Sequence, residues 1–134
     1  MAGYSGTPLM RKIGVREGQR VCLDNAPEDV DLTWPDEVQV SRRITRTPVH
    51  IAWTFCYDRA RLERRIVPLI DHVDVDGMVW VSWPKRSSGL QTDLDENTVR
   101  AIGLAAGVVD VKVAAVDDTW SALKFVRRRR DRNR

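Results

Sequence analysis

The sequence predicts one α/β domain, in which helices form layers around a mostly parallel sheet that ends in an antiparallel hairpin. From residue 49 onward the predicted order is strand, helix, strand, helix, strand, strand, because short apolar runs alternate with longer amphipathic segments. Only a turn separates the last two strand-like segments, which is typical of a hairpin. The length of 134 residues fits one domain, and 43% hydrophobic residues are enough for a core.

The first expected element is a helix over residues 7–14. Thr7 can cap its start and Gly14 can end it. A strand is predicted at residues 20–23, and it stops at the loop formed by residues 24–27.

The next two strands are separated by a basic connector. Residues 38–41 alternate polar and apolar side chains, which predicts an edge strand. Residues 42–48 form the connector and carry three arginines. Residues 49–55 are predicted to form a central strand because most of them are apolar.

A long helix is expected after the central strand, and Asp58 can cap it. Pro68 lies inside the helical pattern, so we expect the helix to kink or to be shortened there. The apolar positions fall on one face of this helix: Leu62, Ile66, Leu69, Ile70 and Val73.

The back half of the chain supplies one more helix and three strands. A turn at residues 75–77 is expected to lead into a strand at residues 78–83. Asp93 and Glu96 have the spacing of a capping box and open a helix that Gly107 closes. The hairpin strands are predicted at residues 108–116 and 121–126, with a turn at Asp117-Asp118-Thr119 between them.

Positive charge is concentrated at the end of the chain. The formal net charge is +3, but residues 127–134 carry six arginines and one aspartate, so residues 1–126 sum to −2. We therefore expect one domain over residues 1–126 that is not a basic nucleic-acid binder, followed by a disordered Arg-rich tail over residues 127–134. If the protein contacts nucleic acid at all, we expect the contact to be through Arg127 to Arg134.

The cysteines and the hydropathy pattern suggest a cytoplasmic protein. Cys22 and Cys56 lie in strand-like runs and are expected to be reduced core thiols. No apolar run approaches the roughly 20 residues that span a bilayer, and the N-terminus lacks a secretion-signal pattern. A hairpin at the edge of the sheet could pair with a second copy, so a homodimer is left open.

The order of elements in the back half carries a resemblance. The relevant segments are residues 49–55, 58–73, 76–77, 78–85, 93–106 and 108–126. They resemble the second half of a Rossmann-like methyltransferase domain, in which a strand and helix precede a glycine turn, a strand ending near Pro-Lys, a helix and a closing hairpin. The resemblance implies a truncated methyltransferase-like fold, S-adenosylmethionine as cofactor, and a methyltransferase-related or nucleotide-using enzyme.

The front half departs from that family's pattern. Methyltransferases follow the first strand with a glycine-rich loop that lets the backbone approach the cofactor, whereas this chain has Asp24-Asn25-Ala26-Pro27. Ser41-Arg42-Arg43 stands where the family has an acidic residue that binds ribose hydroxyls. We therefore expect no cofactor, with S-adenosylmethionine as the alternative that the resemblance raises.

Five short segments carry a second resemblance. They are Tyr4-Ser5-Gly6-Thr7-Pro8-Leu9, Trp83-Pro84-Lys85, Thr92-Asp93-Leu94, Val109-Asp110-Val111-Lys112-Val113 and Thr119-Trp120-Ser121-Ala122-Leu123-Lys124. They are similar to segments of a family of small bacterial proteins of unknown function, found mainly in actinobacteria. This resemblance implies no activity.

The candidate binding site lies where the predicted parallel strands end, because open α/β sheets bind ligands at that edge. Ser87, Ser88 and Gly89 beside two cations could hold an anion, or could form a solvated turn. Trp83 and Tyr57 could stack on a planar ligand, or could cap the core. The full set of candidates is Asn25, Tyr57, Trp83, Lys85, Arg86, Ser87, Ser88 and Gly89.

The spacing of residues supports no catalytic set and no metal site. His50 and His72 are separated by most of a helix and are expected to be structural, and Asp117 and Asp118 are ordinary turn formers. We therefore interpret the chain as a non-catalytic Rossmann-like module that binds an unidentified small molecule or protein. The alternatives are the enzyme named above and a nucleic-acid-associated protein acting through its tail.

Overall fold

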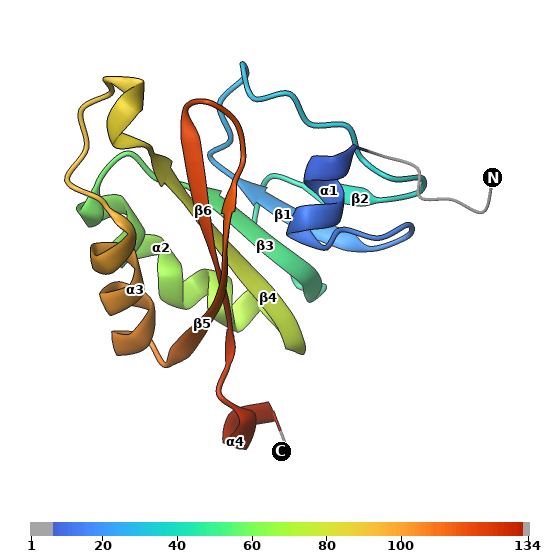
Figure 1. The fold of residues 1–134 in the computed structure, drawn as a ribbon. Coiled ribbons are helices and arrows are strands. Elements are labelled where there is room, and N and C mark those ends of the chain that lie inside the picture. The colour runs from blue at the N-terminus through green and yellow to red at the C-terminus, as the bar shows by residue number, and fades with distance from the viewer. Residues whose placement is uncertain (1–6, 133–134) are drawn as a thin grey trace.

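A six-stranded mixed sheet forms the centre of the computed structural model, which describes residues 7–132 (Figure 1). The strands are β1 (Arg20–Asp24), β2 (Gln39–Ser41), β3 (Val49–Phe55), β4 (Val73–Pro84), β5 (Val108–Ala115) and β6 (Trp120–Arg127). They lie in the order β2-β1-β3-β4-β6-β5. The strands β1 to β4 are parallel to one another, whereas β6 is antiparallel to both β4 and β5. The predicted fold class, including the C-terminal antiparallel hairpin, is confirmed.

Helices cover both faces of this sheet (Figure 1). On one face lie α2 (Arg59–His72) and α3 (Glu96–Ala105), and on the other lies α1 (Pro8–Ile13). A 3₁₀ turn, η1 (Arg86–Ser88), follows β4, and a short helix, α4 (Arg129–Arg132), follows β6. Within residues 7–132, no helix has the length and apolar character needed to cross a membrane.

The predicted caps of the first two helices are confirmed. The hydroxyl of Thr7 accepts a hydrogen bond from the backbone N–H of Met10, and Gly14 ends α1 with a φ of 91°. Asp58 accepts the backbone N–H of Arg61 at 2.8 Å at the start of α2. These side chains satisfy N–H groups that have no partner within the helix.

The predicted start of α3 is wrong by two residues. Asp95, rather than Asp93, caps this helix by accepting the backbone N–H of Thr98 at 2.8 Å. Asp93 instead accepts the backbone N–H of Arg59 at 2.7 Å, so it satisfies a donor in the first turn of α2. The loop before α3 is therefore tied to the start of the neighbouring helix.

Of the two effects predicted for Pro68, a kink or a shortened helix, the shortening does not occur, because α2 continues to His72. Proline removes one backbone donor from the helix. The apolar face of α2 is buried against the sheet at Leu62, Ile66 and Leu69, and this burial stabilises the helix against the lost hydrogen bond.

The strand β4 is longer than predicted, since it begins at Val73 and contains no turn at residues 75–77. Its pairing with β3 is irregular in this region, which is the behaviour of a β-bulge. Gly77 is buried there, and a Cβ atom at this position would lie 2.9 Å from the carbonyl oxygens of both Asp74 and His50. Glycine is thus required by the close approach of two backbone segments rather than by a turn.

The front half of the sheet has no crossover helix. Residues 25–38 link β1 to β2 and residues 42–48 link β2 to β3, and neither loop contains a helix. Parallel strands are usually joined by a helix that covers the sheet. Here Arg61 and Arg65 of α2 extend over the end of β1 and reach Asp24, so the stems of two long side chains supply part of the missing cover.

Cys22 and Cys56 are free and buried, as predicted. Cys22 pairs with Ala52, and Cys56 lies four residues further along the chain from Ala52. At about 3.3 Å per residue the two α-carbons are about 13 Å apart, too far for a disulfide. Burial raises the pKa of both thiols, which keeps them protonated and unreactive.

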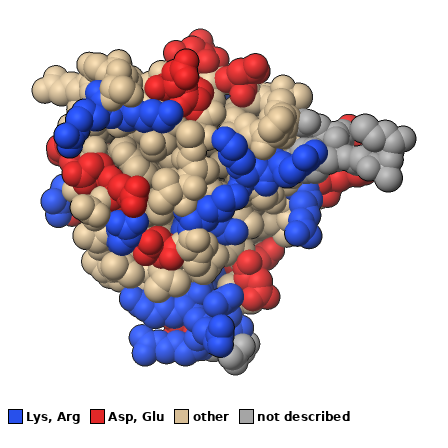
Figure 2. Space-filling view, in the orientation of Figure 1, with Lys and Arg blue, Asp and Glu red and all other residues tan. Residues whose placement is uncertain are grey.

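The basic C-terminal segment is joined to the domain through its first residues. The guanidinium of Arg127, the last residue of β6, donates to three carbonyl oxygens between residues 70 and 74 at 2.6 to 3.3 Å. Arg128 donates to the carbonyl of Leu104 at 3.3 Å, and α4 follows. Figure 2 shows the basic side chains gathered at this end of the molecule, at the bottom of the view. Residues 133–134 of the predicted tail lie outside the described residues.

Candidate ligand-binding site

The carboxyl ends of β1, β3 and β4 share one edge of the sheet, where ligands of open α/β folds bind. Such ligands sit at the switch point, where the chain reverses its direction of travel across the sheet. Here the chain passes from β1 outward to β2 and then returns to β3 on the other side of β1. The switch point therefore lies between β1 and β3.

Two hydrogen bonds bridge this switch point. Thr54 of β3 donates its hydroxyl hydrogen to Asp24 of β1 at 2.7 Å. Asn25, directly after β1, donates its side-chain amide to the carbonyl of Phe55 at 2.8 Å. Asn25 has a φ of 61°, a left-handed conformation that asparagine tolerates better than most residues. The predicted site residue Asn25 thus lies at the expected edge, with its amide bound to the neighbouring strand.

Two arginines of α2 complete the closure at the end of β1. Arg61 and Arg65 donate to different oxygens of Asp24, each at 3.1 Å. With Thr54 the carboxylate has three donors, and Asp24 is only 5% exposed. A buried carboxylate needs such partners because it has lost its water. The protein's own side chains therefore close the end of β1.

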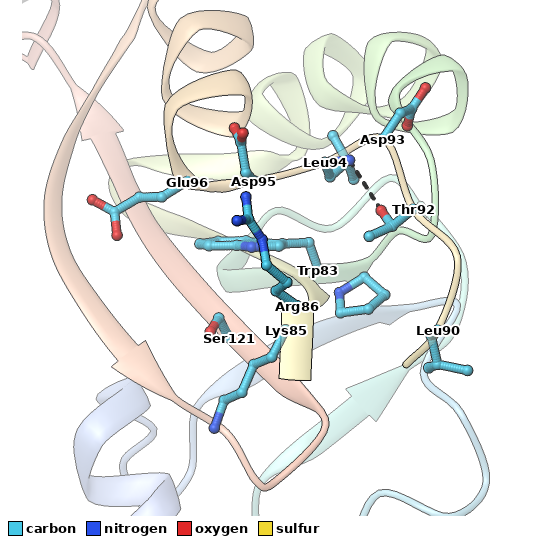
Figure 3. Close-up of a pocket in the computed structure, with 11 residues that line it drawn as sticks. Trp83, Lys85, Arg86, Leu90, Thr92, Asp93, Leu94, Asp95, Glu96 and Ser121 are labelled. Atoms are coloured by element: carbon cyan, nitrogen blue, oxygen red, sulfur yellow. Dashed lines mark hydrogen bonds between the residues drawn. The ribbon is translucent and has the colours of Figure 1, made fainter. Parts of the chain in front are cut away.

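A cavity of about 510 Å³ opens further along the same edge, at the carboxyl end of β4 (Figure 3). Because β6 is antiparallel to β4, the first residues of β6 lie at this end, and Ser121 pairs with Trp83. The loop between β4 and α3 forms the rest of the wall. The lining residues are Trp83, Pro84, Lys85, Arg86, Leu90, Thr92, Asp93, Leu94, Asp95, Glu96 and Ser121.

The cations of this cavity are Lys85 and Arg86. Among residues 7–132, neither side chain forms a hydrogen bond, nor an ion pair within 4 Å. Arg86 nevertheless lies near Asp95, as Figure 3 shows. Two hydrogen bonds from Thr98 lower the pKa of Asp95, and the charge of Arg86 adds a smaller effect in the same direction.

The carboxylates of the cavity, in contrast, have structural partners. Asp93 and Asp95 accept the backbone N–H groups of Arg59 and Thr98, and Glu96 forms an ion pair with Arg100 at 2.6 Å. All three lie at or before the first turn of α3, where the helix dipole favours negative charge. Their presence is explained by the start of α2 and α3.

The structure brings three of the predicted site residues together, since Trp83, Lys85 and Arg86 line the same cavity. Tyr57 lines a neighbouring cavity of about 380 Å³, which shares Thr92 and Asp93 with the first. The ring of Tyr57 is 40% exposed and meets the ring of Trp120 edge to face, with 5.1 Å between centroids.

The remaining predicted residues form the turn that carries the two cations. Ser88 donates its hydroxyl to the carbonyl of Lys85 at 2.6 Å and accepts the N–H of Leu90 at 3.1 Å. Gly89 ends η1 with a φ of 76°. Ser87 is exposed within η1. None of these three lines the cavity.

Three further lining residues, Thr92, Asp95 and Ser121, were not predicted from the sequence. Thr92 and Asp95 belong to the loop and cap of a helix whose start was placed two residues too early. The sequence did contain a signal for Ser121. If the second strand of the hairpin runs antiparallel to β4, its first residues must lie at the carboxyl end of β4.

The other polar candidates have structural partners. His50 accepts the backbone N–H of Arg20 at 3.0 Å, and burial lowers the pKa of His72. Asp117 accepts the N–H groups of Thr119 and Trp120, each at 2.8 Å, and so closes the hairpin turn. In the described part of the chain, no group of three or more His, Cys, Asp or Glu side chains could hold a metal ion.

Several solved structures that superpose on this chain are S-adenosylmethionine-dependent methyltransferases. A TehB-like enzyme from Corynebacterium glutamicum superposes with a TM-score of 0.59 at 8% identity, covering 90% of this chain and 85% of that one. A methyltransferase from Aquifex aeolicus superposes with a TM-score of 0.58 at 12% identity, covering 87% of this chain and 86% of that one. The chain has a methyltransferase-like fold.

Magnesium protoporphyrin IX methyltransferase from Synechocystis PCC 6803, solved with bound S-adenosylhomocysteine, gives a TM-score of 0.53 at 13% identity. That match covers 72% of this chain but only 53% of the enzyme, so the chain spans about half the length of this relative. No protein-family model matches the chain, and no curated protein matches it. The similarity therefore extends to the fold alone.

Proposed function

We propose that this protein is a non-catalytic module that binds a small ligand in the cavity at the end of β4. The observation that carries the proposal is the position of this cavity beside a switch point that is bridged from strand to strand. The volume of about 510 Å³ falls within the range of about 300–1,000 Å³ that is usual for small-molecule sites.

The residues at the switch point do not fit S-adenosylmethionine. A methyl donor bound there would need the backbone after β1 to come close to it, which glycine allows and the segment Asp24 to Pro27 does not. The carboxylate of Asp24 and the amide of Asn25 are already engaged with β3 and α2. A cofactor would have to break these bonds, so we expect none to bind.

The cavity also supports binding better than catalysis. A general acid or base needs a proton-accepting group that is free to reach the substrate. Asp93, Asp95 and Glu96 each have a structural partner at a helix start. Trp83, Leu90 and Leu94 add apolar groups to a lining that is otherwise mostly polar, and Leu90 is the most exposed of the three.

Two measurements test the proposal. A thermal-shift panel of S-adenosylmethionine, S-adenosylhomocysteine, NAD and nucleotides should leave the melting temperature unchanged, whereas a ligand at 100 times its dissociation constant adds about 2.7 kcal/mol. A metabolite library screened by amide NMR on the full chain should give a binder that shifts residues 85–96 and 121, and the cavity-filling variant Ser121→Phe should abolish that binding.

A clear stabilisation by S-adenosylmethionine, with shifts at residues 24–27, would support the methyltransferase alternative instead. The nucleic-acid alternative depends on the basic segment, in which Arg127 and Arg128 already bind carbonyl groups of the domain. Truncation after Val126 would remove any nucleic-acid binding that this segment provides. A screen that shifts no cavity amide refutes small-molecule binding at this site.

A further inference from the structure

We infer that the ligand of the β4 cavity is a small organic anion that carries an aromatic or other flat apolar group. The inference rests on the proposed function and adds the class of ligand. It follows from which charged groups of the cavity already have partners, from the apolar surface between them, and from the hydroxyl on the β6 wall.

The two cations are the charged groups of the cavity that folding does not explain. The arginines near this edge that have partners use them to hold the fold: Arg61 and Arg65 bind Asp24, and Arg100 binds Glu96 and Asp110. Lys85 and Arg86 follow β4 directly and have no such partner among residues 7–132. Arg86 faces Asp95 without an ion pair within 4 Å, and Lys85 has no carboxylate partner among the described residues, so an anion in the cavity would supply a counter-charge to both.

The three carboxylates do not make the cavity a site for cations. Each has an oxygen bound to a backbone N–H group or to Arg100. Figure 3 shows the carboxylates of Asp93 and Glu96 directed to opposite sides of the view, away from Arg86. Only Asp95 faces Arg86, and Thr98 already donates to it. A bound cation would compete with these contacts, whereas a bound anion would leave them intact and would compete only with Asp95 for Arg86.

The strand β6 supplies a third donor for the anion. Ser121 lines the cavity from β6, and its hydroxyl forms no hydrogen bond with another described residue. In Figure 3 Lys85 and Ser121 lie on the β6 side of the cavity, and Arg86 lies at its centre. The exposed side chain of Arg86 is turned toward Asp95, and once it turns toward Ser121 a carboxylate or phosphate held between the three groups would receive two charge-assisted hydrogen bonds and one neutral bond.

The apolar surface favours a ligand larger than a bare anion. The indole of Trp83 is 5% exposed and lies at the centre of the cavity, while Leu90 is 44% exposed at the rim. Because the indole is already buried, the surface that a ligand would remove from water is mainly that of Leu90, and a flat group lying across Leu90 beside the edge of the indole would cover it. Inorganic phosphate would use the cations and leave this surface bare.

Amide NMR on the full chain tests the inference with probes that share a ring and differ in charge. The probes are benzoate and phenyl phosphate, benzylamine, benzyl alcohol, and inorganic phosphate, each at millimolar concentration and low salt. Benzoate and phenyl phosphate should shift the amides of residues 85, 86, 92 and 121. Inorganic phosphate should bind more weakly, and benzylamine should give no shift there.

Charge-removing variants locate the anion. Lys85→Gln and Arg86→Gln should each weaken binding of phenyl phosphate by about tenfold, since each removes one charge-assisted hydrogen bond. The matched control is Arg64→Gln, which changes an exposed arginine of α2 that has no partner among the described residues and should leave the affinity unchanged. All three positions are at the surface, and the amide spectrum of each variant reports whether it is folded.

Three results would overturn the inference. The first is binding of benzylamine or benzyl alcohol at residues 85–96 and 121 as tight as that of benzoate, in which case the cavity binds a ligand without selecting an anion. The second is anion binding that Lys85→Gln and Arg86→Gln leave intact. The third is no binding by any anionic probe. If the metabolite screen still finds a cavity ligand, the proposed function stands without this ligand class; if it finds none, both fail.

Discussion

Replacing Asp24 by alanine tests whether side chains lock the switch point. The substitution removes the shared acceptor of Thr54, Arg61 and Arg65 and leaves two guanidinium groups without their anion. Removing one partner of a buried ion pair costs about 3–5 kcal/mol. The two arginine side chains are 29% and 30% exposed, so water replaces part of the loss. We therefore expect the free energy of unfolding to fall by about 3 kcal/mol, at the lower end of that range.

Urea denaturation followed by tryptophan fluorescence measures this change, and a loss of about 3 kcal/mol should also lower the melting temperature by about 10 °C. The matched control is Asp118→Ala in the hairpin turn, an exposed aspartate, which should change stability by less than about 0.5 kcal/mol. The double variant with Thr54→Val should show a coupling energy of about 0.5 kcal/mol or more. A loss below about 1 kcal/mol for Asp24→Ala, or strict additivity with Thr54→Val, would refute the lock.

Three further substitutions test individual contacts by the same denaturation assay. Gly77→Ala should destabilise the protein by about 1–3 kcal/mol, because its Cβ would press on the carbonyl oxygens of Asp74 and His50; an unchanged midpoint would contradict the close approach. Arg127→Gln should lower the free energy of unfolding by about 2 kcal/mol, because the hydrogen bonds to carbonyl groups are lost. Arg130→Gln is the control and should leave stability nearly unchanged, and equal effects of the two substitutions would show that Arg127 does not anchor the C-terminal segment. Asp95→Ala should lower the free energy of unfolding at neutral pH, since the hydrogen bonds from Thr98 lower the pKa of Asp95. A carboxylate with a lowered pKa stabilises the fold fully above about pH 5 and progressively less below about pH 4. The difference between Asp95→Ala and the wild type should therefore shrink in acid, and a difference that does not change with pH would contradict the capping role.

The predictions that held depend on local chemistry. Thr7 and Asp58 cap helices because their oxygens reach backbone N–H groups three residues away, which sequence spacing reveals. The strand at residues 49–55 was predicted with the bounds that the structure has, since Pro48 precedes its apolar run and the helix cap Asp58 follows soon after it. The final hairpin was predicted because only a turn separates two strand-like segments.

The predictions that failed depend on partners distant in the sequence. Asp76-Gly77 has the composition of a turn, yet the approach of β3 keeps this segment within β4. Asp93 has the spacing of a cap for α3, but it binds the start of α2, 34 residues earlier. The closure of Asp24 by two arginines was also not predicted, because the sequence places these arginines on the polar side of a helix, and their contact with the end of β1 depends on how α2 packs on the sheet.

The direction of β6 explains why the cavity at the end of β4 does not depend on the loop after β1. A parallel neighbour would bring its last residues to the carboxyl end of β4, whereas the antiparallel β6 brings its first. Ser121 therefore pairs with Trp83, and the N–H of Lys85 donates to the carbonyl of Thr119 at 2.7 Å. The cavity between these strands takes no residue from β1 or from the loop after it. Its lining residues thus all come from the back half of the chain, and substitutions that close the switch point leave them in place.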